Sequence, residues 1–372
     1  MKDILYLMHV HWGWIKQRPH FIAELLANSY TVDVAFRKSY NLRQLVNNTK
    51  TERMGFLEIP KIPLINNIPF LKDFGINEFL IKQKILRVLY DYRIVWVTHP
   101  MMYDYIMDAI HSESIIIYDC MDDCLEFPDV VSNKSIYDKL YRIERRLVND
   151  SRIIFCSSEY LKNKLITRYG FRINIHVINN AIQIEQAEMV LVDLPENITK
   201  LFSGNYINIV YLGTISEWID FPMIIESLGL HPEIRYIFIG PKDVNIPQFE
   251  RIVYCGPVEH KYVFSIMQQA DLLIMPFTVT ELIKSVDPVK LYEYIFSGKP
   301  IAAPLYGETI KFKKYVYLYN NNKEFNKIVD NIKSSKKQQK IDEQSCYKYV
   351  MNNTWNNRVR QVVRIMEDLI DL

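Results

Sequence analysis

Short apolar runs alternate with amphipathic segments along most of the chain. In the first half, the apolar runs predict strands at 3–9, 31–36, 54–59, 94–98, 114–118, 152–156 and 175–178. The segments between them have helical spacing and predict helices at 19–28, 76–91, 101–111, 135–150 and 158–169. Apolar strands separated by helices are typical of a parallel sheet that is covered on both faces. We therefore expect one doubly wound α/β domain over residues 1–182.

The alternation pauses at 183–205 and then restarts. It predicts strands at 207–212, 234–239, 251–254, 271–276, 300–303 and 315–319, with helices at 221–229, 259–270, 288–297 and 322–334. This pattern indicates a second α/β domain of similar plan over residues 183–354. Residues 355–372 carry the apolar stripe of an amphipathic helix, which needs a groove to lie in.

Composition narrows the class of protein. The 372 residues are 49% hydrophobic and carry a formal net charge of +2, which excludes a wholesale nucleic-acid binder. An odd number of cysteines, partly within apolar runs, indicates reduced thiols and a cytoplasmic chain. We expect neither a signal peptide nor a membrane-spanning helix. Residues 1–93 hold 14 Lys and Arg against 8 Asp and Glu, which fits either an anionic partner or an ordinary solvated surface.

One short helix combines apolar side chains with a single polar stripe. In "DPVKLYEYIFSGKP", Asp287 is the expected N-cap and Pro288 the first helical residue. Lys290 and Glu293 follow on one face, so the free N–H groups of the first turn and the Lys290 ammonium could bind a phosphate. Glu293 could then accept hydrogen bonds from a ribose diol. The alternative is an exposed Lys–Glu pair, worth only about 0.2–0.5 kcal/mol.

This segment also carries a family resemblance. "ADLLIMPF" followed by "DPVKLYEYIFSGKPIAAP" resembles the donor-binding segment of GT-B glycosyltransferases, particularly the bacterial group-1, family-4-like and teichuronic-acid-type enzymes. "RPHFIAELLA", "YDCMDDCLEF", "VINNA" and "IVYLGTISEWID" resemble further segments in the family order, so the likeness spans about residues 4–305. Ser285 stands where many family-4 enzymes carry a second acidic residue, and Asn180 stands where the family usually has Gly.

The resemblance implies a fold and a donor site. The fold would be GT-B: an acceptor-binding Rossmann-like domain over 1–182, a nucleotide-sugar-binding one over 183–354, and a C-terminal helix, 355–372, that crosses back to the first. Lys290 would hold the donor diphosphate and Glu293 the ribose. The other implied donor-site residues are Gly213, Thr214, Gly256, Val258, Pro288 and Val289. The donor would be a nucleotide-diphosphate sugar of UDP or GDP type, with no bound cofactor and no metal.

Polar residues that directly follow first-domain strands are the candidates for acid–base chemistry. Asp119, His99 and Asp122 are expected in that order of preference, because a partly shielded carboxylate can have its pKa raised toward a base's working range. The alternative for Asp119 is that it caps the following turn. The acidic run 119–129 lacks a D-x-D pattern, which argues against a metal.

The segment 9–20 offers acceptor contacts after the first strand. Trp12 and Trp14 could stack on sugar rings, Gly13 permits a tight turn, and Arg18 could meet an acceptor phosphate. Core packing of the tryptophans and a surface ion pair for Arg18 are the alternatives. The apolar and basic segment 62–93 could dock on the inner face of an anionic membrane, or be an ordinary amphipathic helix.

The leading hypothesis is a hexosyltransferase-type glycosyltransferase. It would move a sugar from a nucleotide-diphosphate sugar to a glycan or lipid-linked acceptor, in bacterial surface polysaccharide or glycoconjugate synthesis. A nucleotide-sugar epimerase of the same fold and a non-catalytic sugar-binding protein are the alternatives. A dinucleotide-dependent dehydrogenase is disfavoured, because no G-x-G-x-x-G follows the first strand of either domain.

Overall fold

The chain divides into two compact units. The computed structural model describes residues 2–13, 16–37, 52–59, 76–172, 174–183, 191–334 and 342–370. Unit 1 comprises Met1–Asn179 and Trp355–Leu372, and unit 2 comprises Asn180–Thr354. Each unit is built around its own parallel sheet.

Unit 1 contains a seven-stranded sheet in the order β3-β2-β1-β4-β5-β6-β7. Its strands are β1 (Lys2–Met8), β2 (Val32–Arg37), β3 (Met54–Ile59), β4 (Tyr92–Val97), β5 (Ile115–Cys120), β6 (Ser151–Cys156) and β7 (Ile175–Val177). All neighbouring strands pair in parallel. The direction of winding reverses between β1 and β4, and ligands of such sheets bind at the carboxyl ends of the strands beside this reversal.

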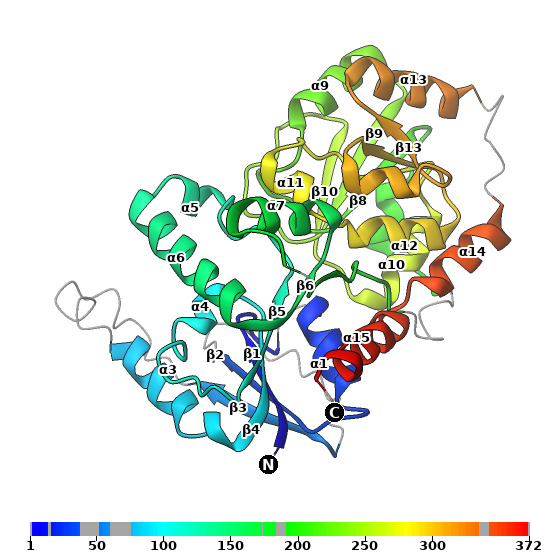
Figure 1. The fold of residues 1–372 in the computed structure, drawn as a ribbon. Helices are drawn as coiled ribbons and strands as arrows, with labels where there is room; N and C mark the ends of the chain where they lie inside the picture. Colours follow the sequence, from blue (N-terminus) through cyan, green and yellow to red (C-terminus); the bar gives the residue numbers. More distant parts are fainter. Residues whose placement is uncertain are drawn as a thin grey trace. The chain divides into compact units, whose positions relative to one another are not determined.

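Seven α-helices accompany the sheet among the described residues of unit 1. They are α1 (Arg18–Leu26), α3 (Ile76–Leu86), α4 (Pro100–Tyr103), α5 (Pro128–Val131), α6 (Lys134–Asp150), α7 (Glu159–Tyr169) and α15 (Trp355–Ile370). Helix α15 lies beside α1 (Figure 1), where the Trp355 and Phe21 rings stack with centroids 5.2 Å apart. Arg93 and Arg152 donate hydrogen bonds to carbonyl groups in the last turn of α15.

One predicted helix of unit 1 is wrong. Sequence spacing predicted a helix over 101–111, but α4 ends at Tyr103 and turns follow. Side chains from elsewhere use the carbonyl groups of this segment: Arg146 donates to the Met107 carbonyl, and Tyr90 donates to the Ala109 carbonyl. Tertiary contacts therefore override the local helical pattern.

Unit 2 contains a six-stranded sheet in the order β10-β9-β8-β11-β12-β13. Its strands are β8 (Ile207–Leu212), β9 (Ile234–Ile239), β10 (Ile252–Gly256), β11 (Leu272–Ile274), β12 (Ile301–Pro304) and β13 (Tyr317–Tyr319). The winding reverses between β8 and β11, so both units place their reversal beside their first strand. The alternation of strands and helices predicted this doubly wound plan for both halves of the chain, and it is confirmed.

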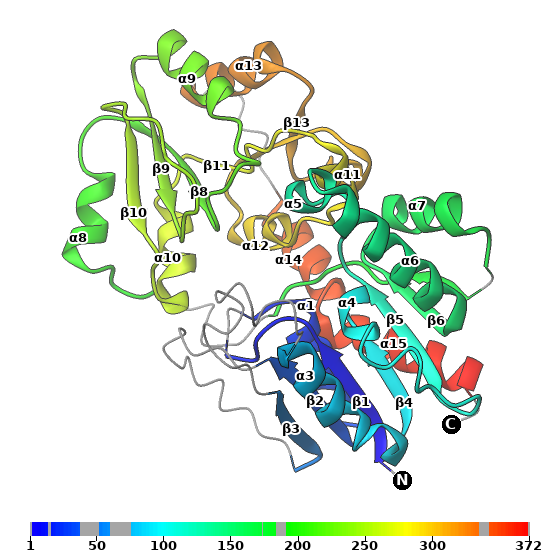
Figure 2. The ribbon, with the colours of Figure 1, turned by 90° about the vertical axis from the view of Figure 1, so that its left-hand side faces the viewer.

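The helices of unit 2 form two layers. Figure 2 shows α9 (Phe221–Leu230) and α13 (Asn322–Lys333) on one side of the sheet, and α10 (Val263–Gln268) and α12 (Val289–Ser297) on the other. The remaining α-helices are α8 (Glu196–Thr199), α11 (Glu281–Ser285) and α14 (Glu343–Asn352). Helix α11 directly precedes α12 along the chain. Within the described ranges, no helix has the length and apolarity needed to cross a membrane.

Candidate functional site

Two glycines make room at the carboxyl edge of the unit 2 sheet. Gly213 directly follows β8 with φ 143°, and a Cβ atom there would lie 2.0 Å from the Lys290 Nζ. Gly240 directly follows β9 with φ 140°, and its Cβ would lie 2.2 Å from the Gly213 carbonyl oxygen. Only glycine fits either position without displacing its neighbour. Gly240 was missed from the sequence, although its place immediately after an apolar strand resembles that of Gly213.

Lys290 lies in the first turn of α12 with its ammonium group against Gly213. Its Nζ is 5.5 Å from the centroid of the Tyr211 ring. Burial lowers the Lys290 pKa, and nearby Glu293 partly opposes this shift. No carboxylate in the described part of the chain forms an ion pair with Lys290. A half-buried cation at the carboxyl edge of a parallel sheet is suited to bind an anionic group.

Glu293, one helical turn after Lys290, borders a largely apolar pocket. The other lining side chains include His260, Phe264, Met267 and Phe296, which come from α12 and from the segment containing α10. An apolar pocket with one carboxylate can hold a flat ring and accept hydrogen bonds from hydroxyl groups. Unit 2 therefore places the Lys290 ammonium one helical turn from a largely apolar pocket that contains one carboxylate.

The remaining predicted donor-site residues lie around this edge. The Thr214 carbonyl accepts a hydrogen bond from Tyr211, and the Gly256 carbonyl accepts one from the Gly240 N–H. Val258 packs against the core of unit 2 and does not line the Glu293 pocket. Pro288 is the N-cap of α12, and Val289 is its first residue.

Asp287 does not cap α12, which corrects the sequence prediction. Its buried carboxylate instead accepts a hydrogen bond from the Asn180 N–H at 2.6 Å and forms an ion pair with Lys311, also at 2.6 Å. The Asn180 side chain in turn donates to the Asp287 carbonyl at 2.8 Å. Asn180, where the family usually has Gly, thus uses its side chain to hold the start of α12.

Unit 1 has its own cavity beside the β1–β4 reversal. This cavity, of about 390 Å³, is lined by His9 after β1, by His99 after β4 and by Asp122 after β5. Burial raises the pKa of Asp122 to about 6; the Arg18 charge opposes the shift, and Asp119 and Asp123 add to it. Burial also lowers the pKa of His99 to about 4, so its imidazole is neutral near pH 7. Two of the three predicted acid–base residues therefore share one cavity.

Asp119, the first choice of base from the sequence, does not line this cavity and is bound to Arg18 instead. Its carboxylate accepts hydrogen bonds from the Arg18 Nε at 2.9 Å and Nη2 at 2.8 Å, and its side chain is fully buried. Arg18 also donates to the Ile178 carbonyl at 2.6 Å. The structure pairs Asp119 with Arg18, so neither is placed like a base or a phosphate ligand. Arg18 does form an ion pair, which was the alternative to an acceptor contact, but the pair is buried and not on the surface.

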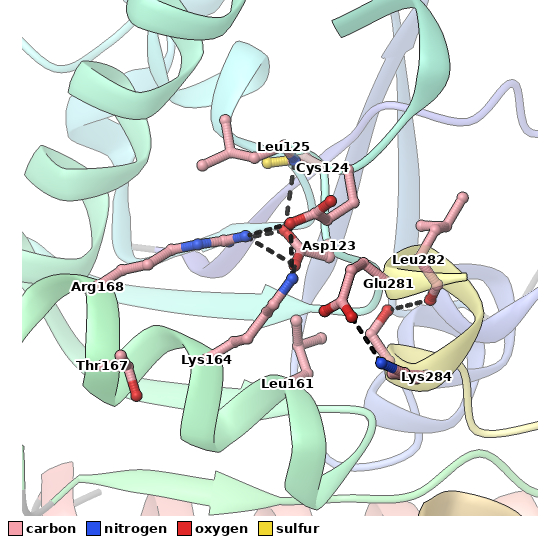
Figure 3. A network of polar contacts seen from close by, with 12 residues as sticks. Asp123, Cys124, Leu125, Leu161, Lys164, Thr167, Arg168, Glu281, Leu282 and Lys284 are labelled. Atoms are coloured by element: carbon pink, nitrogen blue, oxygen red, sulfur yellow. Dashed lines mark hydrogen bonds and ion pairs between the residues drawn. The ribbon is translucent and has the colours of Figure 1, made fainter. Parts of the chain in front are cut away.

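Two further carboxylates of the acidic run, Asp123 and Glu126, form ion pairs with α7. Arg168 and Lys164 point toward the buried Asp123 (Figure 3), with Arg168 donating at 2.6 and 2.8 Å and the Lys164 Nζ at 3.1 Å. Glu126 pairs with the same two cations. Among the described residues, no three His, Cys, Asp or Glu side chains gather as metal ligands would.

The predicted acceptor residues of segment 9–20 are only partly placed. Trp12 is buried, and its ring packs against Phe56 and His20, which favours the core-packing alternative. The Gly13 N–H donates to the His11 ring at 2.9 Å. Trp14 lies outside the described residues, as does the whole segment 62–75 that opens the proposed membrane-docking region.

We compared the chain with protein families and with known proteins. No protein-family model matches the chain. Over 289 residues it is 26% identical to "Putative teichuronic acid biosynthesis glycosyltransferase TuaH" of Bacillus subtilis (strain 168), a match covering 73% of this chain and 70% of that protein.

Solved structures match almost the whole chain. HepE of Anabaena in complex with UDP-glucose has a TM-score of 0.72 and 14% identity, covering 99% of this chain and 100% of that one. Sucrose-phosphate synthase of Thermosynechococcus elongatus has a TM-score of 0.72 and 10% identity, covering 100% of both chains. The chain is thus a GT-B-fold homologue of glycosyltransferases, as the motifs around residues 287–304 predicted.

Proposed function

We propose that the chain transfers a sugar from a nucleotide-diphosphate sugar, of UDP type, to a hydroxyl group of a glycan or lipid-linked acceptor. The observation that carries this proposal is the half-buried Lys290, whose ammonium group lies against Gly213 at the winding reversal of unit 2, one helical turn from the Glu293 pocket. Lys290 would bind the diphosphate, Glu293 the ribose hydroxyls, and the apolar pocket the base. The HepE structure, which binds UDP-glucose, supports the choice of UDP.

Sugar transfer needs a group that stabilises the leaving diphosphate and a group that accepts a proton. The bond between the sugar carbon and the diphosphate oxygen breaks, and the oxygen keeps the electron pair. Lys290 would stabilise the negative charge that develops there. The attacking acceptor hydroxyl loses its proton, and Asp122 is the proposed recipient because its pKa of about 6 lies close to neutral pH.

The relative in Bacillus subtilis suggests the kind of biosynthesis in which the chain acts. Its name assigns it to teichuronic acid biosynthesis, and we extend this to a role for the present chain in bacterial surface polysaccharide or glycoconjugate synthesis. Contact with the inner face of a membrane remains part of this proposal. Helix α3 supports it with Phe79, whose side chain is 60% exposed, on the same helix as Lys82.

Nucleotide-dependent stabilisation tests the donor site. UDP at 100 times its Kd is expected to stabilise the wild type by about 2.7 kcal/mol, and Glu293→Ala is expected to lose most of this effect. Thermal unfolding with UDP, GDP, dTDP, ADP and CMP measures it. Glu196→Ala, which removes an exposed carboxylate of α8, is the matched control and should respond like the wild type. If no nucleotide stabilises the wild type, the polar stripe of α12 is structural and the proposed donor site is wrong.

The pH dependence of transfer tests Asp122. The rate should rise with pH through about 6, because only the ionised carboxylate can accept a proton. Asp122→Asn should lower kcat about a hundredfold and remove this rise. An unchanged pH profile in Asp122→Asn would assign proton removal to another group.

A further inference from the structure

The loop between β5 and α5 carries Asp122 and is bonded to neighbouring elements on both sides of that residue. The Ser157 hydroxyl, which follows β6, donates to the Met121 carbonyl at 2.7 Å. The Arg168 guanidinium of α7 donates to both carboxylate oxygens of Asp123, at 2.6 and 2.8 Å (Figure 3). Asp122, between these two fixed points, lines the unit 1 cavity.

The ion pair between Arg168 and Asp123 is buried. The Asp123 side chain is fully buried, and that of Arg168 is 14% exposed. A guanidinium that donates two parallel hydrogen bonds to one carboxylate fixes its orientation as well as its position. Lys164, one helical turn earlier on α7, places its Nζ 3.1 Å from the same carboxylate. One face of α7 therefore holds the loop that carries Asp122.

Helix α6 holds the next residue of the loop. The Cys124 thiol donates to the Glu144 carboxylate at 3.5 Å. Glu144 is fully buried and also accepts hydrogen bonds from Tyr118 at 2.9 Å and Tyr169 at 2.7 Å. Arg168 lies 3.9 Å from the same carboxylate. The loop is thus bonded to α6 and α7, and Arg168 contacts carboxylates of both the loop and α6.

Arg168 also compensates a negative charge beside Asp122. Burial is the main cause of the raised pKa of Asp122, and the Asp119 and Asp123 charges add to it. Each of these two carboxylates is paired with an arginine, Arg18 or Arg168. The Asp122 carboxylate itself forms no hydrogen bond or ion pair with the other described residues. Loss of Arg168 would therefore leave the Asp123 charge less compensated and hinder ionisation of Asp122.

Other titratable groups face Asp122 across the cavity. They are His9, His99, Tyr118, Cys124 and Asp129. Burial lowers the pKa of the two imidazoles and raises the pKa of the hydroxyl and the thiol, so these four groups are uncharged near pH 7. The charges that change the pKa of Asp122 are therefore those of Arg18, Asp119 and Asp123.

We propose that Arg168 is a positioning residue for sugar transfer: its two hydrogen bonds to Asp123 hold the Asp122 carboxylate in the unit 1 cavity, and its charge compensates the carboxylate next to Asp122. The inference rests on the proposed function, in which Asp122 accepts the proton of the acceptor hydroxyl. Arg168 does not line the cavity and so acts through the loop.

Two substitutions that break the same ion pair should move the pKa of Asp122 in opposite directions. In Arg168→Met, Lys164 remains 3.1 Å from Asp123 and keeps it ionised, so the pKa of Asp122 should rise by about one pH unit. In Asp123→Asn the neighbouring charge is gone, so the pKa of Asp122 should fall. Carboxyl ¹³C NMR of the full chain measures both titrations, with the Asp122 signal identified by its loss in Asp122→Asn.

Two further variants are controls for the titration. Arg168→Lys keeps the positive charge and should leave the pKa of Asp122 close to its wild-type value. Lys162→Met removes another cation of α7, which pairs with Glu159 at 3.9 Å, and should not change the titration. If Arg168→Met and Asp123→Asn shift the pKa of Asp122 in the same direction, or not at all, the proposal is overturned.

Steady-state kinetics tests the effect on transfer. Arg168→Met should lower kcat about ten- to a hundredfold, because displacement of the loop moves the proton acceptor away from the reacting atoms. The KM for the UDP-sugar should change little, and Arg168→Lys should recover part of the lost kcat. A wild-type kcat in Arg168→Met, or a loss confined to KM, would contradict the positioning role.

The NMR titration needs neither donor nor acceptor, so it separates this inference from the proposed function. If the two opposite shifts are found but Asp122→Asn transfers sugar with the wild-type pH profile, Asp122 is not the base, although Arg168 still acts on it. If Asp122→Asn removes the rise of the rate with pH but the opposite shifts are absent, Asp122 remains the base and the role of Arg168 is wrong.

Discussion

Lys290→Met is expected to lower kcat/KM for sugar transfer by about 10²–10³, the usual effect of removing one preorganised group that stabilises developing negative charge. Methionine keeps the length of the side chain and its packing against Tyr211 and Gly213, so the change removes mainly the ammonium group. Steady-state kinetics with a UDP-sugar and an alkyl glycoside acceptor measures the loss.

The matched control is Lys284→Met on α11. Lys284 is exposed and pairs with Glu281 at 2.6 Å, so its replacement should leave transfer nearly unchanged. Gly213→Ala should also lower the rate of transfer, because the added Cβ would lie 2.0 Å from the Lys290 Nζ atom and push the ammonium group aside. If Lys290→Met keeps more than a third of wild-type kcat/KM, Lys290 does not act on the leaving diphosphate.

The lowered pKa of Lys290 adds a pH test with a definite sign. Only the protonated amine attracts a diphosphate, so affinity for UDP should be full at pH values below the Lys290 pKa and fall as pH rises through it. Burial moves this fall to lower pH than for an ordinary lysine. UDP binding by Lys290→Met should be weak and lack this dependence, as calorimetry across the alkaline range can establish.

The sheets could be predicted from sequence because their signal is local. Strands β3, β8 and β9 match the predicted ranges 54–59, 207–212 and 234–239 residue for residue. A parallel strand covered on both faces is predominantly apolar, and every residue of β9 is buried. The Lys290–Glu293 stripe could be predicted for the same reason, because residues three positions apart on a helix lie on the same face.

The polar partners could not be predicted, because they come from distant segments. Arg18 and Asp119 are separated by 101 positions, and Asn180 and Asp287 by 107. A single aspartate after a strand has the same local pattern whether it caps a turn, binds a substrate or pairs with a buried arginine. His9 was overlooked because its contact with Thr98 joins two segments that follow different strands, β1 and β4.

Arg18→Met is expected to destabilise unit 1 by about 3–5 kcal/mol, because it leaves the fully buried Asp119 carboxylate without its cation. The Asp119 Oδ2 already lacks a hydrogen-bond partner among the described residues, so nothing nearby replaces the guanidinium. Arg18 also ties α1 to the Ile178 carbonyl after β7. Urea unfolding followed by tryptophan fluorescence measures the loss as a lower midpoint.

A double variant distinguishes the effect of the unpaired buried charge from the effect of lost side-chain packing. In Arg18→Met with Asp119→Leu, no buried charge remains, so most of the lost stability should return. Arg146→Met is the surface control: its side chain is 45% exposed, and loss of its ion pair with Asp108 should cost less than about 1 kcal/mol. If Arg18→Met costs no more than Arg146→Met, the buried pair does not hold this edge of the sheet. Asp119 would then again be a candidate base, as Asp122 is.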